Sequence, residues 1–308
     1  MPSEMAWMCV ICLHSRDIHV ARCRQSGYQC HMTNKPFLKW VGGKRQLLAD
    51  IAPLVPDQFT RYLEPFVGGG AVFFYLSSHL TDKTIPSLIN DINPELVNCY
   101  QMVKTQTDEL IGLLKTHYHD KDYYLELRNL DRQEGGLAKL SPLHRASRFL
   151  YLNRTGFNGM YRVNSKGLNN VPFGRYKNPS LVNEEVLRAA AQALRFTEIQ
   201  NKPFEDCLAQ AKDGDFVYLD PPYVPLNGTS YFTSYMTDGF SMADQNRLAE
   251  LVRRLDQRGV KFIASNACVP AVKQMYSGFR QIEVKAKRAI NANGNKRQPV
   301  SELLITNI

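Results

Sequence analysis

The sequence has no run of about 18 apolar residues, the length that a helix needs to cross a membrane. Its first apolar run, Met5 to Leu13, is short and follows Glu4, where an export signal would carry positive charge. Repeats and low-complexity segments are absent as well, and the apolar content of 44% is ordinary for a globular protein. We therefore expect a folded protein without a membrane span, of one large domain or two smaller ones.

Cysteine is too sparse and too unevenly placed for a disulfide framework, so we expect a reducing, cytoplasmic location. Residues 1–34 lack a clear helical or strand period, and we expect them to be an extension outside the folded protein, which Met32 could begin. A zinc site and another binding or targeting role stay open as alternatives for this segment. The zinc site would use Cys9, Cys12, Cys23, Cys30 and His31, of which only the first pair has ligand spacing.

Acidic residues are outnumbered: 29 Asp and Glu stand against 38 Lys and Arg, a formal charge of +9. This excess favours an acidic partner, with nucleic acid first. The extension holds three arginines against Glu4 and Asp17, so nearly all of the excess belongs to the rest of the chain.

From residue 37 onward, strand and helix patterns alternate. The segment RYLEPFVGGGAVFFYL predicts a strand, a glycine-rich turn and a helix. The segment IPSLINDINPELVNCYQMVK predicts a second strand ending at Asp91, and then a helix opened by Pro94. The segment DFVYLDPPYVPL predicts a buried strand that runs into a loop fixed by prolines.

The last third of the chain continues this alternation. Ser241 is a candidate N-cap for a helix, with Asp244 three residues later, and VKFIASNA predicts the next strand. The segments FRQIEVKAKRAI and VSELLITNI predict a closing hairpin around a polar loop. Strands separated by helices imply an α/β fold with a mostly parallel sheet. Residues 105–195, first helical and then rich in Asn, Gly, Arg and Tyr, are typical of an insertion into that sheet.

The turn of Gly68, Gly69 and Gly70 lies between an expected strand and helix, where glycine lets a ligand approach the backbone. Asp91 ends the next strand, 91 − 68 = 23 residues later, a spacing typical of an acid that accepts ribose hydroxyls. The unit indicates an adenosine-containing ligand, and a structural turn with an unrelated acid is the alternative. It is not a dinucleotide fingerprint, because Phe73 stands where a small residue is needed. Lys44 is followed by Arg45 rather than Ser or Thr, which excludes a P-loop.

The motif Asp220-Pro221-Pro222-Tyr223 follows a buried strand, at the end where α/β sheets place ligands. The Asp220 carboxylate and the Pro221 carbonyl offer two acceptors, which suits an exocyclic amino group, a double donor. Tyr223 offers a flat face for a planar base. The motif therefore predicts a site for an amino group on an aromatic ring, with a proline-rich strand exit without chemistry as the alternative.

From about residue 35 to the end, these motifs resemble, in family order, the Dam-type DNA adenine-N6 methyltransferases, which use S-adenosylmethionine. FLKWVGGKRQLL resembles the first cofactor motif of that family, EPFVGGGAVF its glycine-rich motif, and DPPY its catalytic motif. FLYLNRTGFNGMYRVN and NVPFGRYKNP look like the segments that read GATC, and RAINANGNKR with ELLITN resembles the closing hairpin.

The resemblance implies roles for these positions. The catalytic residues would be Asp220, Pro221, Pro222 and Tyr223. The residues that bind the cofactor would be Trp40, Lys44, Glu64, Phe66, Gly68, Gly70, Asp91, Ile92 and Asp220. The residues that contact DNA would be Phe157, Asn158, Met160, Arg162, Pro172, Tyr176, Arg288, Lys296 and Arg297. No metal is implied.

The resemblance also implies a domain arrangement. The expected fold is a Rossmann-like class I methyltransferase sheet with helices on both faces, formed by residues 35–104 and 196–308. Residues 105–195 would form an inserted, mostly helical domain that recognises the DNA target.

The implied activity is site-specific methylation of adenine N6 in double-stranded DNA, with the base flipped out of the duplex. The protein would act as a monomer without an obligate protein partner, in the bacterial cytoplasm or as a phage protein there. Cytosine-N4, RNA or protein-amide methylation, and DNA binding without catalysis, stay open as alternatives. Arg162 would read guanine, or else contact a phosphate or solvent, and the basic hairpin would contact phosphates or only solvent.

Overall fold

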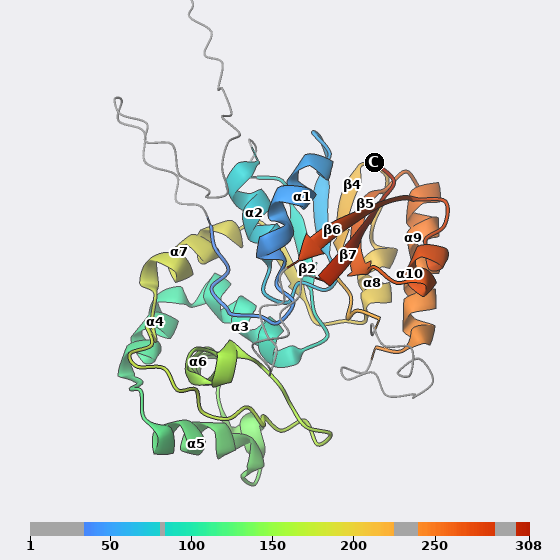
Figure 1. The fold of residues 1–308 in the computed structure, drawn as a ribbon. Helices are drawn as coiled ribbons and strands as arrows, with labels where there is room; N and C mark the ends of the chain where they lie inside the picture. Colours follow the sequence, from blue (N-terminus) through green and yellow to red (C-terminus); the bar gives the residue numbers. More distant parts are fainter. Residues whose placement is uncertain (1–33, 81–83, 225–239, 287–299) are drawn as a thin grey trace, which may run out of the picture. The chain divides into compact units, whose positions relative to one another are not determined.

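The computed structural model describes residues 34–80, 84–224, 240–286 and 300–308. Within these residues, seven strands form one sheet in the order β3-β2-β1-β4-β5-β7-β6 (Figure 1). Strands β1 to β5 are parallel, whereas β7 is antiparallel to both β5 and β6. The strands are β1 (Arg61–Glu64), β2 (Ser87–Asn90), β3 (Thr197–Gln200), β4 (Asp215–Leu219), β5 (Lys261–Ala267), β6 (Arg280–Ala286) and β7 (Val300–Thr306). The expected class I methyltransferase sheet is confirmed.

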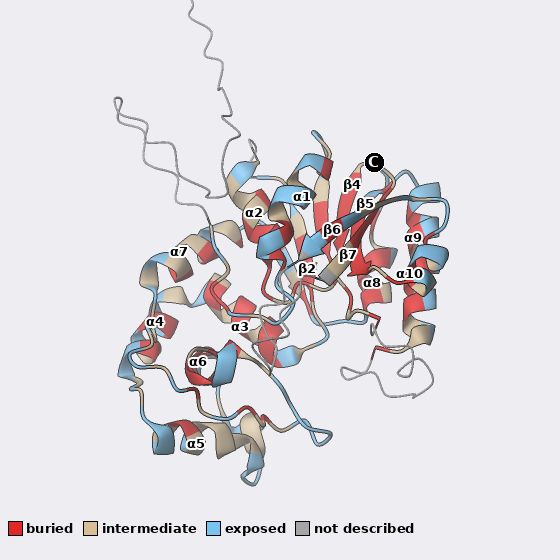
Figure 2. Cartoon of the chain, in the orientation of Figure 1, coloured by how far each residue is buried: buried red, intermediate tan, exposed pale blue. Residues whose placement is uncertain are grey.

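Helices cover both faces of the sheet, because successive side chains of a strand point to opposite sides. On one face, Tyr62 and Phe216 pack with the apolar sides of α1 (Leu48–Ile51), α2 (Ala71–His79), α3 (Pro94–Thr105) and α7 (Glu184–Ala193). On the other face, Leu63 and Val217 pack with α8 (Phe204–Ala209), α9 (Met242–Gln257) and α10 (Pro270–Met275). Figure 2 shows the buried residues along the sheet and on the inward sides of these helices.

Two helix starts that the sequence predicts are confirmed by their caps. The Asn93 side chain accepts hydrogen bonds from the backbone of Glu95 and Leu96, and Pro94 occupies the first turn of α3. Ser241 and Asp244 form a reciprocal capping box at the start of α9. Both caps lie beside segments that carry expected site residues, so they fix the backbone close to the site.

The chain between β2 and β3 contains no strand among its described residues and packs mainly through α3. Helix α6 (Pro142–Thr155) lies against α3 and α4 (Thr107–Thr116), and Arg145 of α6 pairs with Glu95 of α3. Helix α5 (Lys121–Asn129) lies against α6, and short 3-10 turns follow at Leu130–Arg132, Gly136–Lys139 and Phe157–Gly159. The mostly helical insertion is thus present, and its domain limits at residues 105 and 195 stay a prediction.

Some elements were not expected from the sequence. Strand β3 pairs only with β2, at the edge of the sheet, and its second residue, Glu198, is exposed, so it lacks the apolar run of a central strand. Helices α8 and α10 are six residues each, too short for a clear helical period.

Several sequence predictions fall outside the described residues: the extension up to residue 33, with its cysteines, and the hairpin loop, with Arg288, Lys296 and Arg297. In the part of the chain that is described, no helix is long and apolar enough to span a bilayer.

Candidate active site

The glycine turn connects β1 to α2 at the carboxyl end of the sheet. The Val67 amide donates to the Asn90 carbonyl at 2.9 Å, which ties the turn to the end of β2. Gly68 and Gly70 have φ angles of +47° and +69°, in the left-handed region that favours glycine. A Cβ atom at Gly68 would lie 2.8 Å from Cδ1 and Nε1 of Trp40, so the indole of Trp40 lies directly against this turn. Three expected cofactor residues are thereby brought together.

Asp91 follows β2 and faces the same turn. Its Oδ2 accepts the Gly68 amide at 3.0 Å, and its Oδ1 accepts the Asn93 amide at 2.9 Å. Burial raises the pKa of Asp91, and the backbone hydrogen bonds oppose that rise. Each carboxylate oxygen accepts more than one hydrogen bond, so the acid retains acceptor capacity while it also holds the turn.

Glu64, the last residue of β1, is fully buried beside the turn. The Tyr62 hydroxyl donates to its Oε2 at 2.7 Å. Burial raises the pKa of Glu64 to about 8, with a smaller opposing effect of the Tyr62 hydrogen bond. The carboxyl group is therefore mostly protonated at neutral pH.

Two apolar residues expected near the cofactor lie just after strand ends. Phe66 packs against Phe204 and Phe240, with ring centroids 5.4 and 5.8 Å apart. Ile92 is 71% exposed although it is aliphatic. An exposed aliphatic side chain beside Asp91 offers an apolar surface for a ligand that reaches this acid.

Asp220 directly follows β4 and forms an ion pair with Lys44. Lys44 Nζ lies 2.8 Å from Asp220 Oδ1 and 4.6 Å from the ring centroid of Tyr223. The Ser265 hydroxyl donates to the same Oδ1 at 2.8 Å. Among the described residues, Asp220 Oδ2 has no hydrogen-bond partner. One oxygen of the carboxylate is thus held by Lys44 and Ser265, and the other can accept from a further donor.

A buried amide pair holds the loop after Asp220. Gln245 of α9 donates from Nε2 to the Pro222 carbonyl at 2.6 Å and accepts from Asn266 Nδ2 at 3.0 Å. Asn266 Oδ1 in turn accepts the amide of Val224 at 3.3 Å. Gln245 and Asn266 are 0% and 1% exposed, so both amides work inside the core. The Pro222 carbonyl therefore points to the interior, and the Pro221 carbonyl has no partner among the described residues.

The ring of Tyr223 is fixed at its hydroxyl end. This hydroxyl donates to Glu302 Oε2 at 2.6 Å. Burial raises the pKa of Tyr223 well above its usual value, and the nearby Asp220 and Glu302 raise it further. The hydroxyl therefore stays protonated as a donor, which holds the ring in one orientation.

Sequence reasoning missed the residues that support this loop. Their common feature is a polar side chain in a segment that is otherwise buried: Gln245 in α9, Ser265 and Asn266 in β5, and Glu302 in β7. That feature is visible in the sequence, but their partners are distant in the chain.

The expected DNA-reading residues lie in one loop after α6. Phe157 is 46% exposed, and Asn158 is exposed with a φ of +55°. The Phe157 amide donates to the Pro172 carbonyl at 2.9 Å, which brings the two sequence segments side by side. The structure therefore groups these residues and leaves Phe157 accessible.

The remaining residues of this loop have protein contacts. Arg162 is exposed, and its Nε donates to Asn170 Oδ1 at 2.7 Å. Met160 is half-buried. The ammonium of Lys39 lies over the ring of Tyr176, 4.7 Å from its centroid. Arg162 still presents donors to a ligand, because a guanidinium carries five N–H groups.

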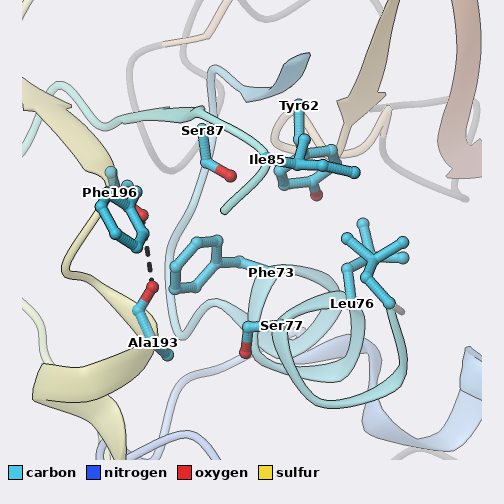
Figure 3. Close-up of a pocket in the computed structure, with 10 residues that line it drawn as sticks. Tyr62, Phe73, Leu76, Ser77, Ile85, Ser87, Ala193 and Phe196 are labelled. Carbon is cyan, nitrogen blue, oxygen red and sulfur yellow. Dashed lines mark hydrogen bonds between the residues drawn. The ribbon is translucent and has the colours of Figure 1, made fainter. Parts of the chain in front are cut away.

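Figure 3 shows a separate small pocket, and none of the residues that line it is an expected site residue. Its cavity volume is about 30 Å³, room for one or two water molecules, and it lies by the first residues of β2 and β3, at the amino end of the sheet. Its lining residues are Tyr62, Phe73, Leu76, Ser77, Leu80, Ile85, Ser87, Ala193, Phe196 and Thr197. The pocket is too small for a nucleoside. It also lies at the amino ends of the strands, whereas α/β sheets bind ligands at the carboxyl ends. No group of three His, Cys, Asp or Glu side chains that could hold a metal occurs in the described ranges.

Comparison with known proteins identifies the family. Residues 40–290 match the model of the D12 class N6 adenine-specific DNA methyltransferases. This chain belongs to that family. The type II methyltransferase M1.LlaDCHI of Lactococcus lactis is 44% identical over 277 residues, which cover 89% of this chain and 95% of that protein. M.MjaIII of Methanocaldococcus jannaschii is 41% identical, covering 90% and 100%, and the DNA adenine methylase of Escherichia coli K12 is 37% identical, covering 88% and 94%.

The D12 methyltransferase is thus an adenine-specific enzyme that acts on DNA, and its methyl donor is S-adenosylmethionine. The Dam-type resemblance is confirmed. The residues at the carboxyl edge of the sheet fit this cofactor: an acid beside the glycine turn, an exposed aliphatic side chain and a buried ammonium. These three suit ribose hydroxyls, an adenine ring and a carboxylate.

Proposed function

We propose that this methyltransferase methylates adenine N6 within GATC in duplex DNA, after the base has flipped into a pocket formed by Asp220, Pro221, Pro222 and Tyr223. The observation that carries the proposal is that Asp220 and Tyr223 both border Lys44 at the carboxyl end of β4, while Asp220 Oδ2 has no donor among the described residues. An acceptor and a flat apolar face are what an aromatic amine requires.

The cofactor is proposed to bind along the edge formed by β1, β2 and β4. Asp91 would accept the ribose hydroxyls, Ile92 would lie against the adenine ring, and Lys44 would meet the carboxylate. The remaining residues that would shape this pocket are Trp40, Glu64, Phe66, Gly68 and Gly70. When bound, S-adenosylmethionine supplies a methyl group on a positively charged sulfur, which a nitrogen lone pair can attack.

The target amine is a poor nucleophile, because its lone pair is delocalised into the adenine ring. Asp220 Oδ2 and the Pro221 carbonyl would accept its two N–H groups, which favours a tetrahedral nitrogen with a localised lone pair. Transfer leaves the nitrogen cationic, and the Asp220 carboxylate stabilises that charge until the proton leaves. No strong base is needed, so positioning supplies most of the acceleration.

The base must leave the duplex first, at a cost of a few kcal/mol. Tyr223 would stack on the flipped adenine, and its hydrogen bond to Glu302 keeps the ring ready for this. Phe157, exposed in the loop after α6, would fill space in the duplex. Both side chains offset part of the lost stacking.

Specificity is proposed to lie in the loop after α6. Arg162 would bond to O6 and N7 of guanine, a contact worth about 1–3 kcal/mol of discrimination. Asn158 and Met160 would read neighbouring bases, supported by Pro172 and Tyr176. Residues 105–195 would form the recognition domain, and Arg288, Lys296 and Arg297 would contact phosphates.

We propose that the enzyme acts as a monomer on DNA in the cytoplasm.

The deciding experiment is expression of the full chain in a methylation-free bacterial host, followed by sequencing of modified bases. N6-methyladenine in GATC supports the proposal, whereas N4-methylcytosine or another site refutes it. Asp220→Ala should abolish transfer of a tritiated methyl group to duplex DNA, while Asp57→Ala, at an exposed acid, should not change it. Substantial transfer by Asp220→Ala contradicts the proposed role.

A further inference from the structure

Tyr161 lies between two proposed base-reading residues, yet its ring faces the cofactor motif. Its ring is stacked on that of Trp40, with centroids 6.0 Å apart and planes at 14°. Phe149 of α6 packs on both rings, 4.8 Å from Tyr161 and 6.4 Å from Trp40. Three aromatic rings therefore connect α6, the base-reading loop and the first cofactor motif.

The side chain of Trp40 also lies against the glycine turn, through its Cβ and the Cδ1–Nε1 edge of the indole. Cβ atoms at Gly68 and Gly69 would lie 2.8 and 2.9 Å from the Trp40 side chain, so indole and turn are in close contact. The turn is itself held, because the Gly68 amide donates to Asp91 and the Tyr100 hydroxyl donates to the Gly68 carbonyl at 3.0 Å. A displacement of the turn must therefore displace Trp40.

The hydroxyl end of Tyr161 faces a second part of the cofactor edge. Burial raises the pKa of Tyr161 to about 12, and the nearby side chain of Asn93, two residues after Asp91, opposes that rise. One side chain in the base-reading loop is thus close to two parts of the cofactor edge: the indole on the glycine turn and the cap that follows the acid.

Hydrogen bonds to the backbone make a second connection between the same two chain segments. The buried Asn153 side chain accepts the Lys39 amide at 3.0 Å and donates to the carbonyls of Lys39 and Gly159 at 2.8 and 2.9 Å. Lys39 immediately precedes Trp40, and Gly159 lies in the loop with Tyr161. The two chain segments therefore move together, with the aromatic stack as the link nearest to the cofactor turn.

We propose that Tyr161 is a positioning residue that couples occupancy of the cofactor pocket to DNA recognition, through its stack on Trp40. This inference rests on the proposed roles of the glycine turn and of the loop after α6. A ligand that orders the turn would order Trp40 and Tyr161, and with them the neighbouring Arg162. Reciprocity then requires that specific DNA tighten cofactor binding by the same factor. One aromatic pair accounts for about a 2- to 10-fold effect.

The test compares the affinity for S-adenosylhomocysteine, the probe, with and without a duplex that contains the methylated site. Calorimetry on the full chain gives both dissociation constants, and their ratio is the coupling factor. We expect a factor of about 2 to 10 for the wild type and for Tyr161→Phe, which keeps the ring, and a factor near 1 for Tyr161→Ala. Val163→Ala, at an exposed neighbour outside the stack, should keep the wild-type factor.

A second readout reports on the stack itself. Trp7 and Trp40 are the two tryptophans of the chain, so Trp7→Phe leaves Trp40 as the sole indole. In that background, specific duplex should change the Trp40 emission, and Tyr161→Ala should abolish the change while Tyr161→Phe retains it. A wild-type coupling factor of 1, or an undiminished factor in a folded Tyr161→Ala, overturns the inference. A wild type that transfers no methyl group to DNA instead overturns the proposed function, which a separate transfer assay detects.

Discussion

Gln245 offers the sharpest test of how the catalytic loop is held. Its amide donates to the Pro222 carbonyl and accepts from Asn266 Nδ2, and its side chain is fully buried. Gln245→Met keeps the length and approximate volume of the side chain but removes both hydrogen bonds. The substitution therefore leaves two partners unsatisfied without opening a cavity.

The expected loss follows from those two partners. Each buried polar group that loses its partner costs about 1–3 kcal/mol, so Gln245→Met should lower the free energy of unfolding by about 2–6 kcal/mol. In a chain of this size that corresponds to a fall in Tm of about 3–9 °C. The loop carries Pro221 and Tyr223, so kcat for methyl transfer should fall by about 10- to 100-fold, as expected for a small misplacement of reacting groups.

Denaturant unfolding and a methyl-transfer assay measure the two effects. Asn246→Met is the matched control, since it places the same side chain at the next, exposed position of α9 and should change stability by less than about 0.5 kcal/mol. If Gln245→Met is as stable as Asn246→Met, the amide pair does not hold the loop, and the reasoning is refuted.

Three further predictions concern the turn, the tyrosine and the buried acid. At Gly68 the φ angle is +47°, and an added Cβ atom would lie 2.8 Å from Trp40. Gly68→Ala should therefore lower the free energy of unfolding by about 2–3 kcal/mol and weaken cofactor binding. At Gly278 the φ angle is +98° and an added Cβ atom would meet no other atom, so Gly278→Ala should lower the free energy of unfolding by only about 1 kcal/mol. If the two substitutions are equally destabilising, the expected clash with Trp40 is refuted. Glu302→Leu should lower transfer about tenfold by releasing the Tyr223 hydroxyl, whereas Glu302→Gln retains an acceptor and most activity; equal rates would contradict this role. The folded pKa of Glu64, about 8 against 4.5, makes the unfolded state lose its proton first, so stability should fall as pH rises between these values. In Glu64→Gln, the free energy of unfolding, measured at a series of pH values, should fall less steeply as pH rises. If its slope against pH is unchanged, other groups cause the pH dependence.

Local patterns were sufficient to predict much of the site. The glycine turn, Asp91 and Asp220 each lie at the end of a strand, and a parallel sheet brings such ends to one edge. Capping chemistry was equally local, so the starts of α3 and α9 were predictable from Asn93-Pro94 and from Ser241 with Asp244.

What the sequence did not reveal depends on pairs that are distant in the chain. Lys44 and Asp220 were both expected to bind the cofactor, but their ion pair was not predicted, because it depends on how η1 (Lys44–Leu47) packs in the fold. Asp91 was expected to hold ribose, and it also holds Gly68 of the turn. Tyr161 was not singled out, because one tyrosine in a polar loop carries no periodic signal. Strand β3 escaped notice because an edge strand needs few apolar residues.

The ion pair of Lys44 bears directly on the order of events in the proposed pocket. Its ammonium contacts Asp220 Oδ1 and lies over the ring of Tyr223, on which the flipped adenine is proposed to stack. A positive charge at that place also opposes the cation that forms on the methylated nitrogen. If the adenine stacks on Tyr223 as proposed, Lys44 would move off that ring, and the carboxylate of the cofactor would be the counter-charge that favours this movement. A buried ammonium without a partner costs several kcal/mol, so base entry and cofactor binding would be energetically linked at Lys44.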